Sequence, residues 1–399
     1  SITRGRIPAA GFFMGSTASS NTFHAWVSGA GPTGCIAALG LAAAGWKVVL
    51  NDPTSMQQLR SRSRAYALTH SSKKLLAELG IWQDLIKNSQ AFKTLQLSDS
   101  SNHKSVCFHQ NNQDLGWIIN HPNLMDLLLE RCRQNPSIEW RVGETIDPDS
   151  APNISPNQLK VIAEGGNSAS RKALGIGFYG WPYRQGCLTV QLELQPQQQL
   201  AGVQPADTAW EMFRPEGPLA VLPLGGNSYQ VVWSAPFKRC QERAALDPAA
   251  LLEALAQVLP IQLKPIALLD KPGAFPVEWR IVPKLVHGNQ LLCGESAHRC
   301  HPVGGQGLNL CWRDVAVLVS EARRMRFRDS NLAVMLRRYQ RRRWLDLICT
   351  MLATDALVRI FSNQQPLLRW LRCRLLQLLK SSATLRQLSL KMANGGWAN

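Results

Sequence analysis

The chain has 399 residues, which is enough for two domains, and its formal net charge is +17. Residues 321–399 carry 16 Lys and Arg against 4 Asp and Glu, so most of the excess charge lies in the last fifth. No nucleic-acid-reading module accompanies that charge, which excludes nucleic acid as the expected partner. No run of about 18 uncharged apolar residues occurs, so no membrane-spanning helix is predicted.

The opening segment, residues 1–21, is basic and then rich in Ser and Thr, and the first 51 residues contain no acid. We expect a disordered leader or tag here. The composition is also compatible with an organelle transit peptide, and a start at Met14 is an equal interpretation.

The first patterned segment, residues 25–52, predicts a strand, a glycine turn, an Ala-rich helix and a second strand. Gly29, Gly31 and Gly34 followed by Asp52 form a dinucleotide-binding fingerprint in its required βαβ context. Gly29 makes the turn, Gly31 lets a pyrophosphate approach the backbone, and Gly34 permits close helix packing. Asp52 is expected to accept hydrogen bonds from the ribose hydroxyls.

Residues 187–280 alternate apolar and polar positions, which is typical of antiparallel strands with one covered face. Residues 92–110 are also strand-like, whereas the chain from residue 331 onward has helical periodicity with interleaved Arg and Leu. The sequence therefore predicts an α/β fold: a Rossmann-like nucleotide-binding domain interleaved with an antiparallel sheet, plus C-terminal helices. We expect the nucleotide-binding domain to comprise residues 22–90, 115–180 and 280–325. The substrate domain would comprise 91–114 and 181–279, and the basic C-terminal helices 326–399.

The stretch GESAHRCHPVGGQGLNL, residues 294–310, places glycines directly before an apolar helix. Glycines allow close backbone approach, and the helix N-terminus attracts negative charge, so we expect a flat or anionic ligand here. His298, Cys300 and His301 have no second ligand cluster at zinc-site spacing, and no metal site is predicted. Ten irregularly spaced cysteines without C-x-x-C predict free thiols in a reducing compartment.

Three separated blocks resemble one family: GAGPTG with Asp52, EGGNSASR, and residues 294–310 followed by an Arg-Asp pair. The chain resembles the FAD-dependent aromatic hydroxylases of the p-hydroxybenzoate hydroxylase fold. The similarity is closest to the branch that hydroxylates rings in ubiquinone and plastoquinone biosynthesis. AWEMFRPEGPLAVLPL and RRYQRRRWLD are also similar to that branch.

The resemblance implies FAD as the cofactor and NADH or NADPH as the co-substrate. Arg64 and Glu164 would lie in the cofactor site, Glu295 would approach the ribityl and phosphate region, and Pro302 would lie beside the reacting edge of the flavin. Backbone groups from Gly305, Gly307, Leu308 and Asn309 would face the pyrimidine side of the ring, where reduced flavin carries negative charge. No catalytic base is assigned. His298 and His301 are neighbours for which a structural role is an equal interpretation.

The implied reaction transfers oxygen from O2 through a flavin C4a-hydroperoxide to a prenylated phenol or quinol precursor. The Arg- and Leu-rich tail favours a membrane surface as a partner of a cytoplasmic, peripherally bound enzyme, although solvated arginines on a helical cap are the alternative. Glu at positions 164 and 295, where the family usually has Asp, and a short 141–162 region leave two alternatives open. These are a non-catalytic flavin-binding or assembly protein in a biosynthetic complex, and a hydroxylase of a small soluble phenol.

Overall fold

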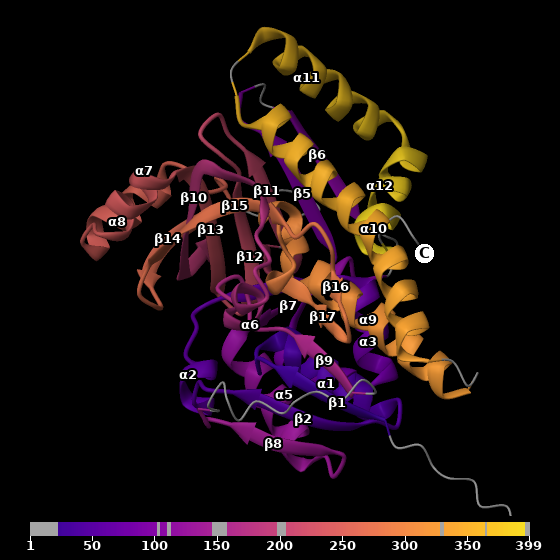
Figure 1. Cartoon of the computed structure of the whole chain (residues 1–399). Coiled ribbons are helices and arrows are strands. Elements are labelled where there is room, and N and C mark those ends of the chain that lie inside the picture. The colour runs from indigo at the N-terminus through magenta and orange to yellow at the C-terminus, as the bar shows by residue number, and fades with distance from the viewer. Residues whose placement is uncertain are drawn as a thin grey trace, which may run out of the picture.

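The computed structural model describes residues 23–101, 104–109, 113–145, 158–197, 205–327, 331–363 and 365–395. The expected leader, residues 1–21, lies outside this part of the chain, as do residues 146–157 of the short segment. Two large sheets and a set of C-terminal helices make up the molecule (Figure 1). The mixed α/β fold predicted from the sequence is confirmed.

A six-stranded sheet forms one half of the molecule, in the order β16-β17-β9-β1-β2-β8. Its strands are β1 (His24–Ser28), β2 (Lys47–Asp52), β8 (Ile138–Val142), β9 (Gln158–Ile162), β16 (Val286–His287) and β17 (Gln290–Leu292). All neighbours are parallel except β16 and β17. The carboxyl ends of β1, β2 and β9 therefore meet at one edge, where ligands of open parallel sheets bind.

Helix α1 (Pro32–Ala43) packs beside this sheet between α5 (His121–Gln134) and α9 (Gln306–Phe327), each of which contacts it. Helix α1 is apolar all round, and every residue from Gly34 to Leu41 is buried. A helix of that kind must be covered on all sides. Close contact with α9 depends on Gly40, because a Cβ there would lie 2.3 Å from Cγ2 of Val319.

A nine-stranded sheet forms the other half, in the order β18-β15-β10-β13-β12-β11-β5-β6, with β14 paired to β10. Its strands are β5 (Thr94–Asp99), β6 (Lys104–His109), β10 (Tyr179–Pro196), β11 (Thr208–Phe213), β12 (Leu219–Gly225), β13 (Ser228–Pro236), β14 (Leu263–Leu268), β15 (Gly273–Ile281) and β18 (His298–Arg299). All pairs are antiparallel except β11 with β5. Helices α7 (Phe237–Ala244) and α8 (Pro248–Ala256) cover one face.

A small sheet of β3 (Ala65–Leu68), β7 (Gly116–Asn120) and β4 (Gln90–Phe92) lies between the two halves. Short helices complete the connections: α2 (Met56–Arg60), α3 (His70–Glu78), α4 (Trp82–Leu85), α6 (Ala169–Ala173), η1 (Ile86–Asn88), η2 (Pro205–Asp207), η3 (Gly294–Ser296) and η4 (Val303–Gly305). The free face of the nine-stranded sheet packs on this region through a buried apolar cluster that includes Phe213, Ile118 and Val303.

The C-terminal helices are α10 (Leu332–Phe361), α11 (Pro366–Ser381) and α12 (Ala383–Gly395). Helix α10 runs along both halves of the molecule (Figure 1). Trp279 of β15 donates to the carbonyl of Met351 at 3.1 Å, and Arg372 of α11 is fully buried beside Asp99. Within the described residues, no helix is both long and apolar enough to cross a bilayer.

Candidate functional site

The glycines in the turn after β1 differ in what surrounds them. A Cβ on Gly29 would lie 2.4 Å from the carbonyl oxygen of Ala163, and one on Gly34 would lie 1.7 Å from the carbonyl oxygen of Gly29. These two positions need glycine for packing within the protein. Gly31 differs, since a Cβ there would meet nothing within 4 Å. Open space beside Gly31, at the N-terminus of α1, is what an anionic diphosphate requires.

Asp52 braces this turn from the end of β2. Its carboxylate accepts the backbone N–H of Ala30 and that of Thr54, each at 2.8 Å. Each carboxylate oxygen keeps a further lone pair that could accept a ribose hydroxyl. Asp52 thus stabilises the turn by hydrogen bonds, and its expected hydrogen bond to a ribose stays a prediction.

Glu164 lies in the turn after β9, where its carboxylate is engaged locally. It accepts hydrogen bonds from the hydroxyl of Ser168 at 2.7 Å, the N–H of Ser170 at 2.9 Å and the hydroxyl of Ser170 at 2.5 Å. These bonds close the N-terminal turn of α6. The side chain of Glu164 thus caps the N-terminus of α6, and a contact between Glu164 and the cofactor stays a prediction.

The turn that carries Glu295 is held by a buried ionic network. Asp314 of α9 accepts the N–H of Gly294 at 2.8 Å, Nε2 of His298 at 2.8 Å and Nε of Arg343 at 2.7 Å. Burial opposes ionisation of Asp314, but His298 and Arg343 outweigh it and lower its pKa to about 2. Arg343 also pairs with Asp346 in α10. His298 is therefore a structural anchor that ties the turn to α9 and α10.

Glu295 itself is 46% exposed and pairs with Arg299 at 3.2 Å. Arg299 also reaches Glu278 of β15 at 3.3 Å. It lies over Gly166, where a Cβ would come within 2.5 Å of its guanidinium carbon. One arginine thus joins the turns at residues 164–166 and 294–296 to the nine-stranded sheet.

The second glycine cradle, residues 302–309, connects β18 to α9. Gly304 and Gly305 have φ of +66° and +63°, which side-chain-bearing residues resist, and Gly307 has nothing within 4 Å of a built Cβ. The side chain of Asn309 donates to the carbonyls of Ala67 at 2.7 Å and Gly305 at 2.8 Å. Open space therefore lies beside Gly304 and Gly307, while Asn309 holds the shape of the cradle from inside.

Pro302 and Leu308 frame this cradle, and His301 lies directly behind it. Leu308 is partly buried against the main core, and Pro302 precedes η4. His301 is fully buried; its Nδ1 accepts the N–H of Val303 at 3.2 Å, and its ring packs edge-on against Tyr183 at 5.5 Å. Burial lowers the pKa of His301 to about 4, so the ring is neutral near pH 7.

Arg64 reaches from the start of β3 to the nine-stranded sheet. Its guanidinium lies 5.1 Å from the ring centre of Phe275 in β15. It also favours the thiolate of Cys187 in β10, whose pKa burial raises to about 12. Arg64 is thus at the boundary of the two halves, and contact with the cofactor phosphate or ribose stays a prediction.

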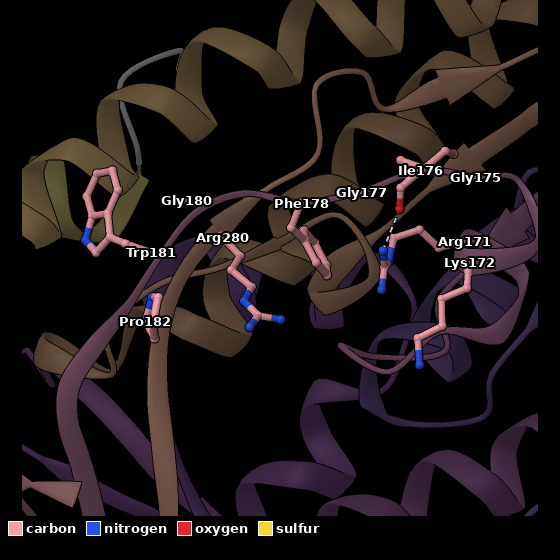
Figure 2. Close-up of a pocket in the computed structure, with 10 residues that line it drawn as sticks. All are labelled: Arg171, Lys172, Gly175, Ile176, Gly177, Phe178, Gly180, Trp181, Pro182 and Arg280. Atoms are coloured by element: carbon pink, nitrogen blue, oxygen red, sulfur yellow. Dashed lines mark hydrogen bonds between the residues drawn. The ribbon is translucent and has the colours of Figure 1, made fainter.

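Two clefts open near these segments. The larger, of about 530 Å³, is lined by residues of the α6–β10 loop and by Arg280 (Figure 2). The smaller, of about 310 Å³, lies between β10 and α10 and includes Tyr183, the residue that contacts His301. The hydroxyl of Tyr183 donates to Asp355 of α10.

Sequence reasoning assigned no role to Asp314 and Arg343, which are buried beside the Glu295 turn, or to Glu211, which is buried near the second cradle. Glu211 of β11 is 8% exposed, and its carboxylate faces the N–H of Gly304. A charge inside an alternating apolar strand was the available signal. All ten cysteines are free, and no group of three metal-ligating side chains occurs in the residues that the structure describes.

Comparison with known proteins relates the chain to FAD-binding proteins. Residues 157–343 match the family described as FAD binding domain. The chain is 29% identical to protein slr1300 of Synechocystis over 96% of this chain and 95% of that protein. It is 28% identical to 3-demethoxyubiquinol 3-hydroxylase of Escherichia coli, covering 92% of this chain and 97% of the relative. The human mitochondrial ubiquinone biosynthesis monooxygenase is 25% identical over 82% and 80% of the respective chains.

Solved structures show the same fold. The crystal structure of p-nitrophenol 4-monooxygenase from Pseudomonas putida superposes with a TM-score of 0.72 at 17% identity, covering 94% of this chain and 98% of that one.

Proposed function

We propose that this chain, which is similar to FAD-dependent monooxygenases of the same fold, hydroxylates the ring of a prenylated phenol in quinone biosynthesis, using NAD(P)H and O2. The names of the E. coli and human relatives support this substrate class. The observation that carries the proposal is the pair of glycine cradles, at residues 29–34 and 302–309, with open space beside Gly31 in the first and beside Gly304 and Gly307 in the second.

The residues present fit FAD. Gly31 and the N-terminus of α1 would receive the diphosphate, and the amides around Gly305 and Gly307 would lie along the ring. When bound, FAD accepts a hydride from NAD(P)H and, with O2, supplies one oxygen atom to the substrate ring. The network around Asp314 fixes the Glu295 turn, and Asn309 fixes the second cradle, so both would be preorganised before the cofactor arrives.

The free face of the nine-stranded sheet would exclude water from the reacting ring. Ala209, Phe213 and Leu222 on that face belong to the apolar cluster that also contains Val303 of the second cradle. A dry site matters because water allows the activated oxygen to be lost as hydrogen peroxide. The same cluster includes residues of α10 and α11, so the C-terminal helices would complete the cover.

The larger cleft has the positive charge expected of a site that binds the phosphates of NAD(P)H. Arg171, Lys172 and Arg280 line it without any carboxylate (Figure 2). Phe178 lies between the two arginines, 4.0 Å from the guanidinium of Arg171. Trp181 is 37% exposed; its ring stacks on Trp279 at 4.6 Å, and the guanidinium of Arg359 lies 5.2 Å from its ring centre. Phosphate groups suit the basic lining of this cleft.

The outer surface of α10 and α11 supports peripheral membrane binding. Leu367, Trp370 and Leu378 of α11 are 73%, 56% and 54% exposed, on the helix face opposite the buried Arg372. Arg374 lies between them and packs on Trp370 at 5.5 Å. Helices α10 and α11 run side by side at the edge of the molecule (Figure 1). Exposed Leu and Trp with interspersed Arg are typical of helices that lie in the headgroup region of anionic membranes.

The test is substrate-dependent NAD(P)H oxidation by the FAD-loaded protein, with hydrogen peroxide measured in parallel. We expect prenylated phenols in liposomes to stimulate oxidation and to give hydroxylated product with little peroxide. Equal coupling with a small soluble phenol would indicate the small-phenol alternative. NAD(P)H oxidation that yields only peroxide with every phenol would contradict the proposal and favour a non-catalytic or assembly role.

A further inference from the structure

A single carboxylate projects from the nine-stranded sheet toward the second cradle. Strand alternation puts Ala209, Glu211 and Phe213 on one face of β11, and the first and third belong to the buried cluster that includes Val303. The backbone N–H of Gly304 approaches the carboxylate of Glu211. Glu211 therefore lies between the sheet that would cover the substrate and the loop that would carry the reacting edge of the cofactor.

The surroundings of Glu211 are apolar. Its register partners are Leu97 in β5 and Ala220 in β12, and it is 8% exposed. Tyr183 and, behind it, His301 are ionisable groups that pack near this apolar cluster. Glu211 adds to the rise in the pKa of the Cys187 thiol, while Arg64 opposes it. Burial raises the pKa of Glu211 to about 7, against the opposing effect of the Gly304 N–H.

Glu211 also differs from most of the other buried acids; Asp52, which likewise forms no ion pair, accepts two backbone N–H groups. Asp314, Asp346 and Glu321 each form an ion pair with arginine. Among the described residues, no Lys or Arg forms an ion pair with Glu211. Burying an unpaired carboxylate is unfavourable, so its presence here is unexplained by stability. A buried acid in a site, with one hydrogen-bond donor and a shifted pKa, is a candidate for proton transfer.

We infer that Glu211 is the catalytic residue that binds the hydroxyl group of the phenol substrate and accepts its proton. This inference rests on the proposed function. The O–H bond of the phenol breaks, the proton bonds to a carboxylate oxygen of Glu211, and the electron pair stays on the phenolate oxygen. The added electron density reaches the ortho and para carbons, which makes them better acceptors of the oxygen atom. The proton leaves to solvent when the product departs.

The environment suits this role. A phenol has a pKa of about 10, and an ordinary glutamate, near 4, is a poor acceptor for its proton. Burial makes Glu211 more basic and narrows that gap. The Gly304 N–H favours the ionised carboxylate and so limits this rise in the pKa of Glu211.

The test compares Glu211→Gln with the wild-type protein, both loaded with FAD, on phenols of graded acidity. Gln keeps the shape but cannot take a proton. We expect kcat to fall at least about 100-fold with weakly acidic phenols and much less with 4-nitrophenol, which ionises unaided. Infrared titration should reveal a carboxyl group with a midpoint near pH 7 in the wild type that is absent from the variant. Glu253→Gln, on the exposed surface of α8, is the matched control and should change neither kcat nor the infrared titration.

The outcomes separate the two proposals. A wild-type protein that hydroxylates no phenol contradicts the proposed function. A wild type that hydroxylates phenols, together with a Glu211→Gln variant whose rates fall equally for all phenols or not at all, overturns the assignment of Glu211. Should Glu211→Gln fail to fold, Glu211→Asp provides the test, because it keeps a proton acceptor at shorter reach. A Glu211→Asp variant whose kcat is lower but changes with pH as in the wild type supports the assignment. A Glu211→Asp variant whose kcat does not depend on pH overturns it.

Discussion

Replacing Gly31 by Val should remove FAD binding without unfolding the protein. Gly31 has φ of −71° and ψ of −177°, an extended conformation that valine adopts, and a Cβ there meets nothing within 4 Å. Loss of chain flexibility should raise the free energy of unfolding of the FAD-free protein by 0 to about 1 kcal/mol. The new side chain would occupy the space meant for the diphosphate. We expect the Kd for FAD to rise at least 100-fold, which is about 2.8 kcal/mol.

Gly34→Ala is the matched comparison, because its Cβ would lie 1.7 Å from the carbonyl oxygen of Gly29. Backbone cannot move that far in a packed βαβ unit, so we expect a loss of about 3 kcal/mol of unfolding free energy. Urea unfolding of the FAD-free proteins and fluorescence titration with FAD measure the two effects separately. Normal FAD affinity in a folded Gly31→Val protein would refute the assignment of this turn to the diphosphate.

Three further outcomes are expected. Asp314→Asn should lower the unfolding free energy by about 3 kcal/mol in denaturant titrations, because it removes one of the two carboxylates paired with the buried Arg343 and the ionic partner of His298. Since the pKa of Asp314 is lowered to about 2, its ionisation contributes stability that is present above about pH 4 and is lost as pH falls toward 2. The free energy of unfolding, measured between pH 2 and 6, should show this loss in the wild type and not in Asp314→Asn. Arg280→Gln should raise the Kd for NADPH about tenfold while leaving that for FAD unchanged, and equal loss of both would argue against docking in the larger cleft. Leu367→Glu with Trp370→Glu should abolish sedimentation with anionic liposomes, and unchanged sedimentation would favour a solvated cap.

The first cradle could be predicted because its signal is local. Residues 25–52 contain the strand, the glycines, the helix and the acid in consecutive order, and each is dictated by its own neighbours. The same holds for the glycines before α9. Sequence pattern also gave the mixed α/β fold, since alternating and helical segments are distinguishable by period alone.

Features that depend on distant partners could not be predicted. Asp314 and Arg343 are 29 positions apart on different helices, and their pairing depends on how α10 crosses α9. The internal bonds of Glu164 and Asn309 depend on local folding that their residue types do not specify. The significance of Glu211 depends on which face of β11 meets the second cradle. The domain divisions and the cofactor contacts of the individual site residues stay predictions.

The most direct test of the central claim is the origin of the added oxygen. The purified protein, loaded with FAD, is given NADPH and a prenylated phenol in liposomes under ¹⁸O2, and the product is analysed by mass spectrometry. The account predicts one labelled oxygen on the ring for each NADPH consumed. Unlabelled product, or NADPH consumption that yields only labelled hydrogen peroxide, would contradict a monooxygenase acting on these phenols.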